Sequence, residues 1–245
     1  MKLKKALFIP DTHVPYHDKR AWNLMMKVAK ELKPDIICIA GDFADFYCVS
    51  SHDKSPERED QLAEEIKQVN EALDQLDSCN AKEKIFVAGN HEDRLDRYLK
   101  TKAPELYSLV RVKQLFNLHK RGWKYVPYKQ STKVGKLHLT HDTGTAGAMA
   151  HSKALADFQD NVVIGHTHRT AYTVVGNAKG VPHVGAMFGW LGDVNQVDYM
   201  HQVKANRDWS LGFGIGYFQP NGNFHLVPMT LVDYSVVLEG KLIKG

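Results

Sequence analysis

Three short apolar segments in the first 90 residues limit the folds open to this chain. They occupy positions 5–9, 35–40 and 84–88, and each is followed by proline or glycine and then by aspartate or asparagine. Between them, apolar residues recur with a helical period over 18–32 and over about 56–76. Strands that are apolar along their length and alternate with helices predict a parallel sheet with helices on its faces. We therefore expect an α/β fold.

The remainder of the chain continues this alternation and then becomes rich in strands. Helices are expected at about 92–117, interrupted at Pro104, and at about 148–158. Strands are expected at about 123–126, 136–140, 161–164, 170–176, 213–218, 224–227 and 234–238. Residues 220–223 are typical of a hairpin turn. Because the sequence shows no repeat or linker, we expect a single domain over residues 1–245.

Composition excludes several classes of protein. Hydrophobic residues make up 43% and charged residues 24%, which is typical of a folded globular protein. No apolar run approaches the ~18–20 residues of a membrane helix, and the apolar stretch at 6–9 is too short for a signal peptide. The three cysteines form no CxxC pair. We therefore expect a reduced, cytoplasmic protein without a disulfide framework.

Polar clusters follow five of the expected strands. They are Asp11-Thr12-His13, the Gly41–Asp45 segment with Asp42, Gly89-Asn90-His91-Glu92, His141, and Gly165-His166-Thr167-His168. Open α/β sheets bind ligands at the carboxyl ends of their strands, so these side chains are expected at one edge. Pairs such as Asp11 and His13 would point the same way from an extended segment, and the glycines would allow sharp turns.

The residue types in these clusters favour a metal site. Aspartate oxygens and neutral imidazoles are ligands of borderline divalent metals, and the absence of cysteine argues against a closed structural zinc site. The alternative is that each residue separately caps a helix or satisfies a local hydrogen bond. Five clusters in order, each after an expected strand, favour a shared site over that alternative.

In this order, the motifs D-x-H, G-D-x-x-D, G-N-H-E, an isolated histidine and G-H-T-H resemble the calcineurin-like metallophosphoesterase superfamily from Asp11 to His168. The resemblance implies a four-layer α/β/β/α sandwich with two central mixed sheets, the second supplied by the strand-rich C-terminal part. It also implies a metal-dependent phosphoester hydrolase that uses a water or hydroxide bridging two divalent ions. Such a site accepts Mn, Fe, Zn or Co, and we favour Mn.

The resemblance also implies a role for each residue. One ion would be bound by Asp11, His13 and His168 and the other by Asn90, His141 and His166, with Asp42 bridging them. His91 would face the phosphate as a catalytic residue, and Asp45 would orient it. Glu92 is either a competing orienting group or an acid in the first turn of a helix.

One position departs from the family pattern. The isolated histidine is usually followed by glycine, whereas His141 is followed by Asp142, and glycine comes only at 144. We keep His141 as the ligand because it ends an expected strand, and His138 is the fallback.

Further residues are candidates for substrate binding. Arg94 and Arg97 could share one helix face and bind phosphate, although a surface pair with neighbouring aspartates is an equal alternative. His17 could reach substrate from the first ligand loop, with a role near a helix start as the alternative. Trp190 and Trp209 could stack a base, with core packing as the alternative.

Charge is unevenly distributed in this chain of net charge +4. Residues 106–141 contain eight lysines or arginines and no acid, with four aromatic residues interleaved, whereas residues 57–77 are acidic. A basic, aromatic segment suits an anionic partner such as a nucleotide or nucleic acid, and a solvated face is the alternative.

Local features narrow the substrate class. Protein phosphatases of this superfamily carry Arg-Gly where this chain has Phe46-Tyr47. We expect the second sheet to take up the residues after His168, and we therefore expect no appended DNA-capping or substrate domain. The motifs look like those of small phosphoesterases encoded by bacteriophages, which favours a phosphomonoesterase acting on (deoxy)nucleoside 5′-monophosphates. The alternatives are a phosphodiesterase or nuclease acting on DNA or on cyclic or dinucleotides, and a non-catalytic binding module. The oligomeric state stays open.

Overall fold

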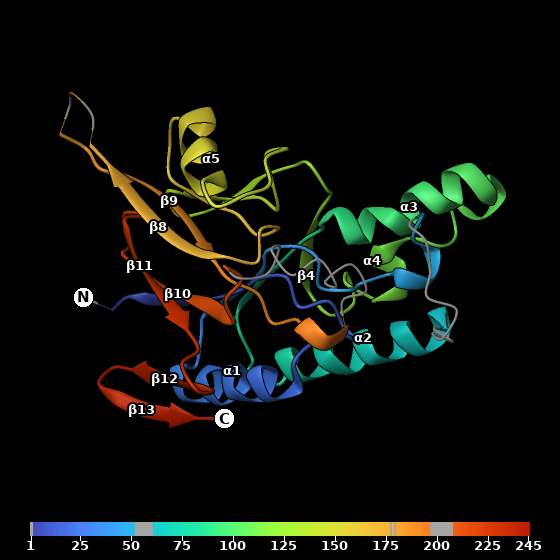
Figure 1. Cartoon of the computed structure of the whole chain (residues 1–245), viewed down its shortest axis with the longest axis horizontal. Coiled ribbons are helices and arrows are strands. Elements are labelled where there is room, and N and C mark those ends of the chain that lie inside the picture. Colours follow the sequence, from blue (N-terminus) through green and yellow to red (C-terminus); the bar gives the residue numbers. More distant parts are fainter. Residues whose placement is uncertain (1, 52–60, 177, 179, 197–207) are drawn as a thin grey trace.

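The computed structural model describes residues 2–51, 61–176, 178, 180–196 and 208–245, and two mixed sheets form its centre (Figure 1). The first sheet has the order β11-β10-β1-β2-β3-β4. Four of its strands are parallel neighbours, and a C-terminal hairpin adds the other two in antiparallel register. The strands are β1 (Lys4–Ile9), β2 (Ile36–Ile39), β3 (Glu83–Val87), β4 (Trp123–Val126), β10 (Gly212–Phe218) and β11 (Phe224–Thr230).

The second sheet has the order β5-β6-β7-β9-β8. Its central strands β6, β7 and β9 are parallel, while β5 and β8 pair in antiparallel register at the two edges. The strands are β5 (Thr132–Val134), β6 (Leu137–Leu139), β7 (Val162–Val163), β8 (Thr170–Val175) and β9 (His183–Phe188). A small hairpin of β12 (Ser235–Leu238) and β13 (Lys241–Lys244) follows.

Helices cover the outer faces of both sheets. In Figure 1, α1 and α2 lie on one side of the molecule and α5 lies on the opposite side, next to β8 and β9. The α-helices are α1 (Lys19–Leu32), α2 (Leu62–Asp77), α3 (Asn90–Lys102), α4 (Val112–Leu115) and α5 (Ala150–Phe158), and short 3-10 turns occur at Tyr47–Val49, Pro104–Leu106 and Val194–Gln196.

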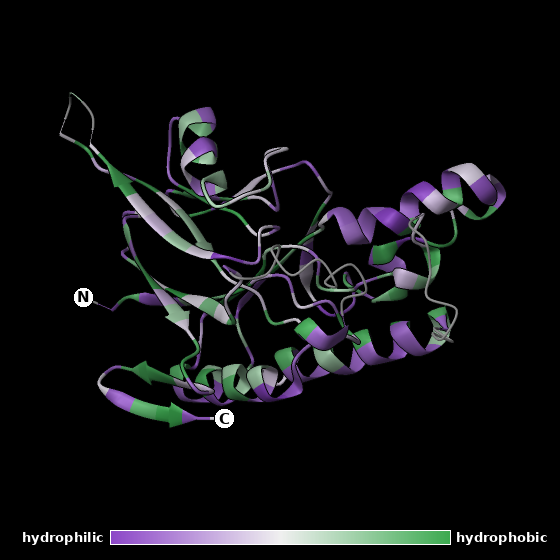
Figure 2. Ribbon diagram, in the orientation of Figure 1, coloured by the Kyte–Doolittle hydropathy of each residue, from purple (hydrophilic) through white to green (hydrophobic). Residues whose placement is uncertain are grey.

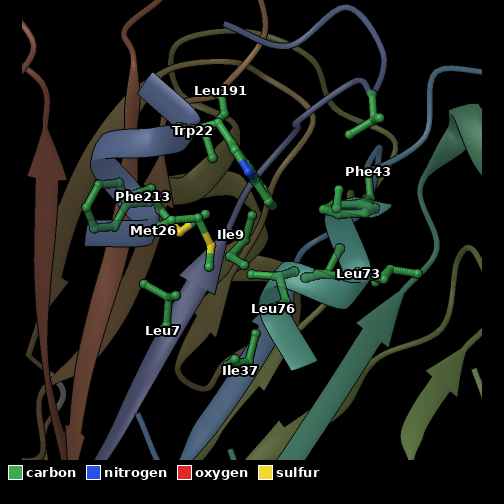
Figure 3. Packing of buried hydrophobic residues seen from close by; sticks show 14 of the residues in the cluster. Leu7, Ile9, Trp22, Met26, Ile37, Phe43, Leu73, Leu76, Leu191 and Phe213 are labelled. Atoms are coloured by element: carbon green, nitrogen blue, oxygen red, sulfur yellow. The ribbon is translucent and has the colours of Figure 1, made fainter. Parts of the chain in front are cut away.

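Side-chain alternation along the strands separates the apolar layers. In β1, Leu7 and Ile9 pack under the helices, whereas Ala6 and Phe8 join the apolar layer that links the two sheets. Figure 3 shows the first layer, in which Leu7 and Ile9 lie near Trp22 of α1. A third cluster lies between α5 and the second sheet. These layers confirm the expected four-layer α/β/β/α sandwich with two central mixed sheets.

Apolar stripes and capping explain the helices. Figure 2 shows α1 and α2 with mixed purple and green surfaces, as amphipathic helices on a sheet should have. Asp18 caps α1 by accepting hydrogen bonds from the backbone N–H groups of Arg20 and Ala21.

Several expected boundaries differ from those observed. The helix expected from about 56 is described only from Leu62, since 52–60 lie outside the described residues. The helical stretch expected over 92–117 is interrupted at Pro104 as expected, but its second part is only the short α4. Strands β5, β9 and β13 were not expected. Gly185 in β9 breaks the apolar pattern where α5 crosses, because a Cβ there would lie 2.5 Å from the His151 carbonyl oxygen.

Candidate metal centre

All five polar clusters meet at one edge of the two sheets. Three groups of side chains have potential ligand atoms within 4.8 Å of one another. They are Asp11 with His13 and His168, Asp42 with His141 and His166, and Asp45 with His13 and His91. The loops that follow β1, β2, β3, β6 and β7 supply these residues. The structure therefore brings together the side chains that the sequence places after five separate strands.

In the first group, two imidazole nitrogens face each other. The Nε2 atoms of His13 and His168 are 3.1 Å apart, and Asp11 Oδ1 lies 3.7 Å from His168 Nε2. His13 Nδ1 is 2.9 Å from Asp45 Oδ2, so this nitrogen carries the proton that it donates to the carboxylate. The lone pair of His13 Nε2 therefore points toward His168 and Asp11, as it would in a metal ligand.

The second group places a nitrogen lone pair among oxygen acceptors. His141 Nδ1 donates to the Ala40 carbonyl oxygen at 2.9 Å. Its Nε2 atom lies 3.0 Å from Asn90 Oδ1 and 3.2 Å from Asp42 Oδ2, and His166 Nδ1 lies 2.9 Å from the same Asn90 oxygen. Because Nδ1 already donates to Ala40, these oxygens are satisfied only if Nε2 also carries a proton or a cation lies between the atoms. A cation between these atoms satisfies all of them, so the donor set fits a divalent metal.

The burial of two neighbouring carboxylates, those of Asp11 and Asp42, also favours a bound cation. Burial raises the pKa of Asp11 to about 7, and the nearby Asp42 carboxylate adds to this effect. Burial acts in the same direction on Asp42, but His141 and His91 outweigh it and hold the pKa of Asp42 well below its usual range. Burial lowers the pKa of His141, yet Asp42 raises it to about 10. Without a cation, protons have to balance these carboxylates.

His91 lies beside the two groups and is held by Asp45. Its Nδ1 atom donates to the Asp45 carbonyl oxygen at 3.0 Å and lies 3.2 Å from Asp45 Oδ2. Arg94 donates from Nη1 to that carbonyl at 2.9 Å and from Nη2 to His91 Nε2 at 3.0 Å. The expected pairing of Asp45 with His91 is thus present in the geometry, and Arg94 lies next to both. Asp45 also binds His13, which the sequence did not indicate.

The ligand loops are not extended, contrary to expectation. His13, Asp42, His166 and His168 have φ values of 56°, 48°, 72° and 58°, in the left-handed region. Non-glycine residues adopt this region rarely and at a cost, and such residues concentrate at functional sites. The side chains of the D-x-H and H-T-H pairs therefore converge through left-handed turns.

Two glycines make room for the ligands. Gly41 has φ 97°, and a Cβ there would lie 2.2 Å from His141 Nδ1. At Gly89 a Cβ would lie 2.1 Å from Asp42 Oδ1. Position 41 therefore needs glycine for a sharp turn and for the close approach of His141. Position 89 needs glycine only because Asp42 lies so close.

Some candidate residues lie elsewhere. The Arg97 side chain is 59% exposed and pairs with Asp93, so the surface alternative describes it. His17 packs its ring against Trp22. His138 contacts Asp160, so it does not replace His141. These three residues lie near the cluster in sequence, but their side chains contact other partners.

Glu92 has a different role from the one considered first. Its carboxylate accepts hydrogen bonds from the backbone N–H groups of Asp42 at 3.0 Å, Ala44 at 2.8 Å and Gly89 at 2.7 Å. It is therefore an acid in the first turn of α3 that also holds the loop carrying Asp42.

Aromatic rings enclose His168. Trp190 stacks on its ring with centroids 4.6 Å apart, and Trp209 contacts it edge-on at 4.2 Å. Trp190 is buried, in agreement with core packing, whereas Trp209 is half-buried. An aromatic surface thus lies directly beside the cluster.

Comparison with known proteins identifies the family. The model of the calcineurin-like phosphoesterase family matches residues 4–202. The chain belongs to this family. It is therefore a metal-dependent phosphoesterase, as the order of its motifs implied. The family's metal chemistry agrees with the clustered histidines and aspartates.

This phosphoesterase is similar over most of its length to a phage protein and to two solved structures. It is 25% identical to the Gene 54 protein of Mycobacterium phage D29 over 270 residues, which cover 95% of this chain and 96% of that protein. Vacuolar Protein Sorting 29 from Cryptosporidium parvum has a TM-score of 0.51 at 15% identity, covering 99% of this chain and 95% of its own. A Vps29 variant from Entamoeba histolytica has a TM-score of 0.50 at 14% identity, covering 97% and 95%. These two structures show the fold.

The described part of this phosphoesterase contains no helix with the length and apolar character needed to cross a membrane.

Proposed function

We propose that this phosphoesterase hydrolyses phosphomonoesters and that (deoxy)nucleoside 5′-monophosphates are its substrates. The observation that carries the proposal is the half-buried ring of Trp209 beside a buried metal-binding donor set, 4.2 Å from His168 between centroids. The donor set suits the phosphate, and the ring offers a nucleobase a surface for stacking. The likeness to a phage protein agrees with the resemblance of the motifs to those of phage-encoded phosphoesterases.

We assign two divalent ions to the cluster. One ion would be bound by Asp11, His13 and His168. The other ion would be bound by Asn90, His141 and His166, and Asp42 would bind both ions. Oxygen and imidazole donors suit Mn, Fe, Zn or Co, and Mn is our first choice. Such a pair of ions, when bound, supplies a Lewis acid for phosphate oxygens and makes a bound water more acidic.

His91 and Arg94 serve the phosphate in this proposal. Asp45 fixes the Nδ1 side of the His91 ring, so a phosphate or leaving oxygen would approach the Nε2 side, in place of the contact that Nε2 makes with Arg94. Arg94 Nη2 lies 3.0 Å from that nitrogen, so its guanidinium reaches the same place and can balance the phosphate charge. Arg94 is thereby a candidate for substrate binding, unlike Arg97 and His17.

The phosphodiesterase or nuclease alternative depends on the basic segment at 106–141. Arg111 pairs with Asp96, Arg121 pairs with Asp74 and Asp77, and Lys133 pairs with Asp160. The two arginines therefore bind acids of α2 and α3 instead of presenting a free basic face. These pairs weaken the case for a groove that binds nucleic acid.

We also propose a single domain over residues 1–245 in a reducing cytoplasm. One apolar layer contains buried residues from both sheets, such as Phe8 and Val163, which favours one cooperative unit. All three cysteines are free, in agreement with a reducing compartment.

A substrate panel tests the proposed class. With Mn²⁺ present, we expect phosphate release from p-nitrophenyl phosphate and from nucleoside monophosphates, and little turnover of bis-p-nitrophenyl phosphate or single-stranded DNA. Diester turnover without release from monophosphates would exclude the nucleotidase. Two bound ions without turnover of any compound would favour a binding module.

The stacking surface has its own test. Trp209→Ala should raise KM for nucleoside monophosphates by about tenfold, as the loss of one stacking contact predicts, and leave KM for ribose 5-phosphate unchanged. Trp209→Phe, which keeps a ring, is the matched control and should restore most of the affinity. Equal effects on both substrates would show that Trp209 only packs.

A further inference from the structure

The turn that carries Asp45 is held by a buried acid from a different element. Glu65 of α2 is only 4% exposed, and its carboxylate accepts a hydrogen bond from the backbone N–H of Phe46. Its other oxygen lies 3.9 Å from Cys48 Sγ. Helix α2 is otherwise acidic on its solvent side, so a buried carboxylate at this position calls for a reason.

The backbone at Phe46 needs such a partner. Phe46 has φ 53° and is fully buried, with its ring stacked on Phe116 at 5.9 Å. A large non-glycine residue stays in the left-handed region only where its surroundings hold it. The N–H of Phe46 would otherwise be a buried donor without an acceptor, which destabilises the folded state.

One peptide unit connects Glu65 to the site. The N–H of the Asp45–Phe46 peptide donates to Glu65, and the C=O of the same peptide accepts from His91 Nδ1 at 3.0 Å and from Arg94 Nη1 at 2.9 Å. Because a peptide is planar, fixing its N–H also fixes the direction of its carbonyl. The orientation of His91 thus depends on an acceptor in α2.

We propose that Glu65 is a positioning residue for His91, acting through the Asp45–Phe46 peptide. The described contacts of its carboxylate are with Phe46 and Cys48, neither of which is a candidate metal ligand. Its effect on turnover comes from holding the carbonyl that binds the imidazole. This inference rests on the proposed function only in giving His91 a role toward phosphate.

Kinetics of matched variants give the first test. Glu65→Ala should lower kcat for p-nitrophenyl phosphate by about 10- to 100-fold, the scale expected for a slightly misplaced catalytic group. KM and Mn²⁺ affinity, measured by calorimetry, should stay within about twofold, since no ligand is touched. Glu65→Gln keeps an acceptor oxygen and should restore most of kcat. Glu64→Ala, at an exposed neighbour in the same helix, is the control and should match the wild type.

A double-mutant cycle separates positioning from general stability. In a His91→Ala background, Glu65→Ala should lower kcat no further, because the group that it positions is absent. An equal loss in both backgrounds would overturn the proposal.

Nuclear magnetic resonance of the metal-free protein provides a test without turnover. Glu65→Ala should shift the Phe46 amide signal and, with it, the ring ¹⁵N signals of His91, whereas Glu65→Gln, which keeps the acceptor, should leave the His91 ring near its wild-type position; the signals of His138 should stay in place in both. A shifted Phe46 signal with an unchanged His91 ring in Glu65→Ala would overturn the proposal, and if that variant does not fold, a displaced His91 ring in Glu65→Gln without a change at Phe46 would do so. If nucleotides are not hydrolysed, only the substrate assignment fails and this test is unaffected.

Discussion

The Nε2 atom of His141 lies between oxygens of Asn90 and Asp42, while the other ring nitrogen already donates to Ala40. The two carboxylate oxygens of Asp42 have different partners. Oδ2 lies 3.2 Å from His141 Nε2, and Oδ1 accepts a hydrogen bond from the backbone N–H of His91 at 2.8 Å. Its left-handed φ of 48° aims the carboxylate into the cluster. Its backbone carbonyl oxygen accepts the N–H of His13 at 2.9 Å, so Asp42 contacts candidate ligands from both groups.

Asp42→Asn should therefore weaken both metal sites. The substitution keeps the size of the side chain but removes the negative charge that two cations would share. We expect Mn²⁺ affinity to fall by about tenfold or more at each site, measured by calorimetry. Asp142→Asn, next to His141 but outside the clusters, is the control. Unchanged occupancy in Asp42→Asn would refute the shared position.

His91→Ala should separate metal binding from turnover. Because we assign His91 to phosphate, the variant should bind both ions and lose about 10²–10⁴-fold in kcat, the range of a general acid or base. Metal content and steady-state rates are measured on the same sample, with His138→Ala as a control histidine. Loss of a metal ion from His91→Ala would show that His91 is a ligand.

At the level of elements, short loops after the strands leave little space around the cluster. Gly41 follows β2, and the ring of His141 fills the space where a Cβ would be. Glu92 at the start of α3 and Glu65 in α2 bind backbone N–H groups of the 42–46 loop. Two helices therefore determine the shape of one loop.

Gly41→Ala should displace His141 and lower Mn²⁺ affinity as well as stability. An alanine Cβ would lie 2.2 Å from His141 Nδ1 at φ 97°, so the loop has to move. Gly144→Ala is the matched control, because Gly144 also has a positive φ of 79° but nothing lies within 4 Å of its Cβ position. Calorimetry and thermal unfolding of both variants check this, and equal metal affinity in the two would contradict it.

At the level of the whole molecule, buried charge connects metal binding to stability. The carboxylates of Asp11, Asp42 and Glu92 are almost fully buried within a few ångströms of the site. Burial and Asp42 raise the pKa of Glu92 to about 7, so its charge too is unfavourable without a cation. Ligands that bind only the folded state stabilise it by mass action.

Removal of metal should therefore lower the melting temperature. An ion present at a thousand times its Kd contributes about 4 kcal/mol, which corresponds to about 10 °C for a chain of this size. Thermal unfolding with Mn²⁺, after treatment with EDTA and after adding Mn²⁺ back measures the change. Identical curves in all three conditions would argue against ions in the buried cluster.

The basic and acidic segments of the chain form ion pairs with each other in the folded molecule. The basic segment and the acidic helix, which are opposite in sign along the chain, meet where Arg121 binds Asp74 and Asp77. Its Nη1 atom lies 2.6 Å and 2.7 Å from their oxygens. The asymmetry therefore contributes to an internal contact and is not only a surface for an anionic partner.

The order of motifs was sufficient to predict the α/β class, the family and the side chains that meet at the cluster. These predictions depend on local information. An apolar run predicts a strand, and the residues directly after the strand lie at the edge of the sheet where the strand ends. Local information failed at strand β9, because Gly185 interrupts its apolar pattern and is explained only by α5, which crosses the strand there.

Three-dimensional contacts were needed for the roles that we propose for Glu65 and Trp209 and for the surface position of Arg97. Arg94 and Arg97 are alike in sequence, but one lies beside His91 and the other binds Asp93 at the surface. The sequence did not single out Glu65, because its contact with Phe46 joins two elements that are apart along the chain. Residue type and spacing specify which groups are available, whereas burial and the direction of each bond depend on chain segments far apart in sequence.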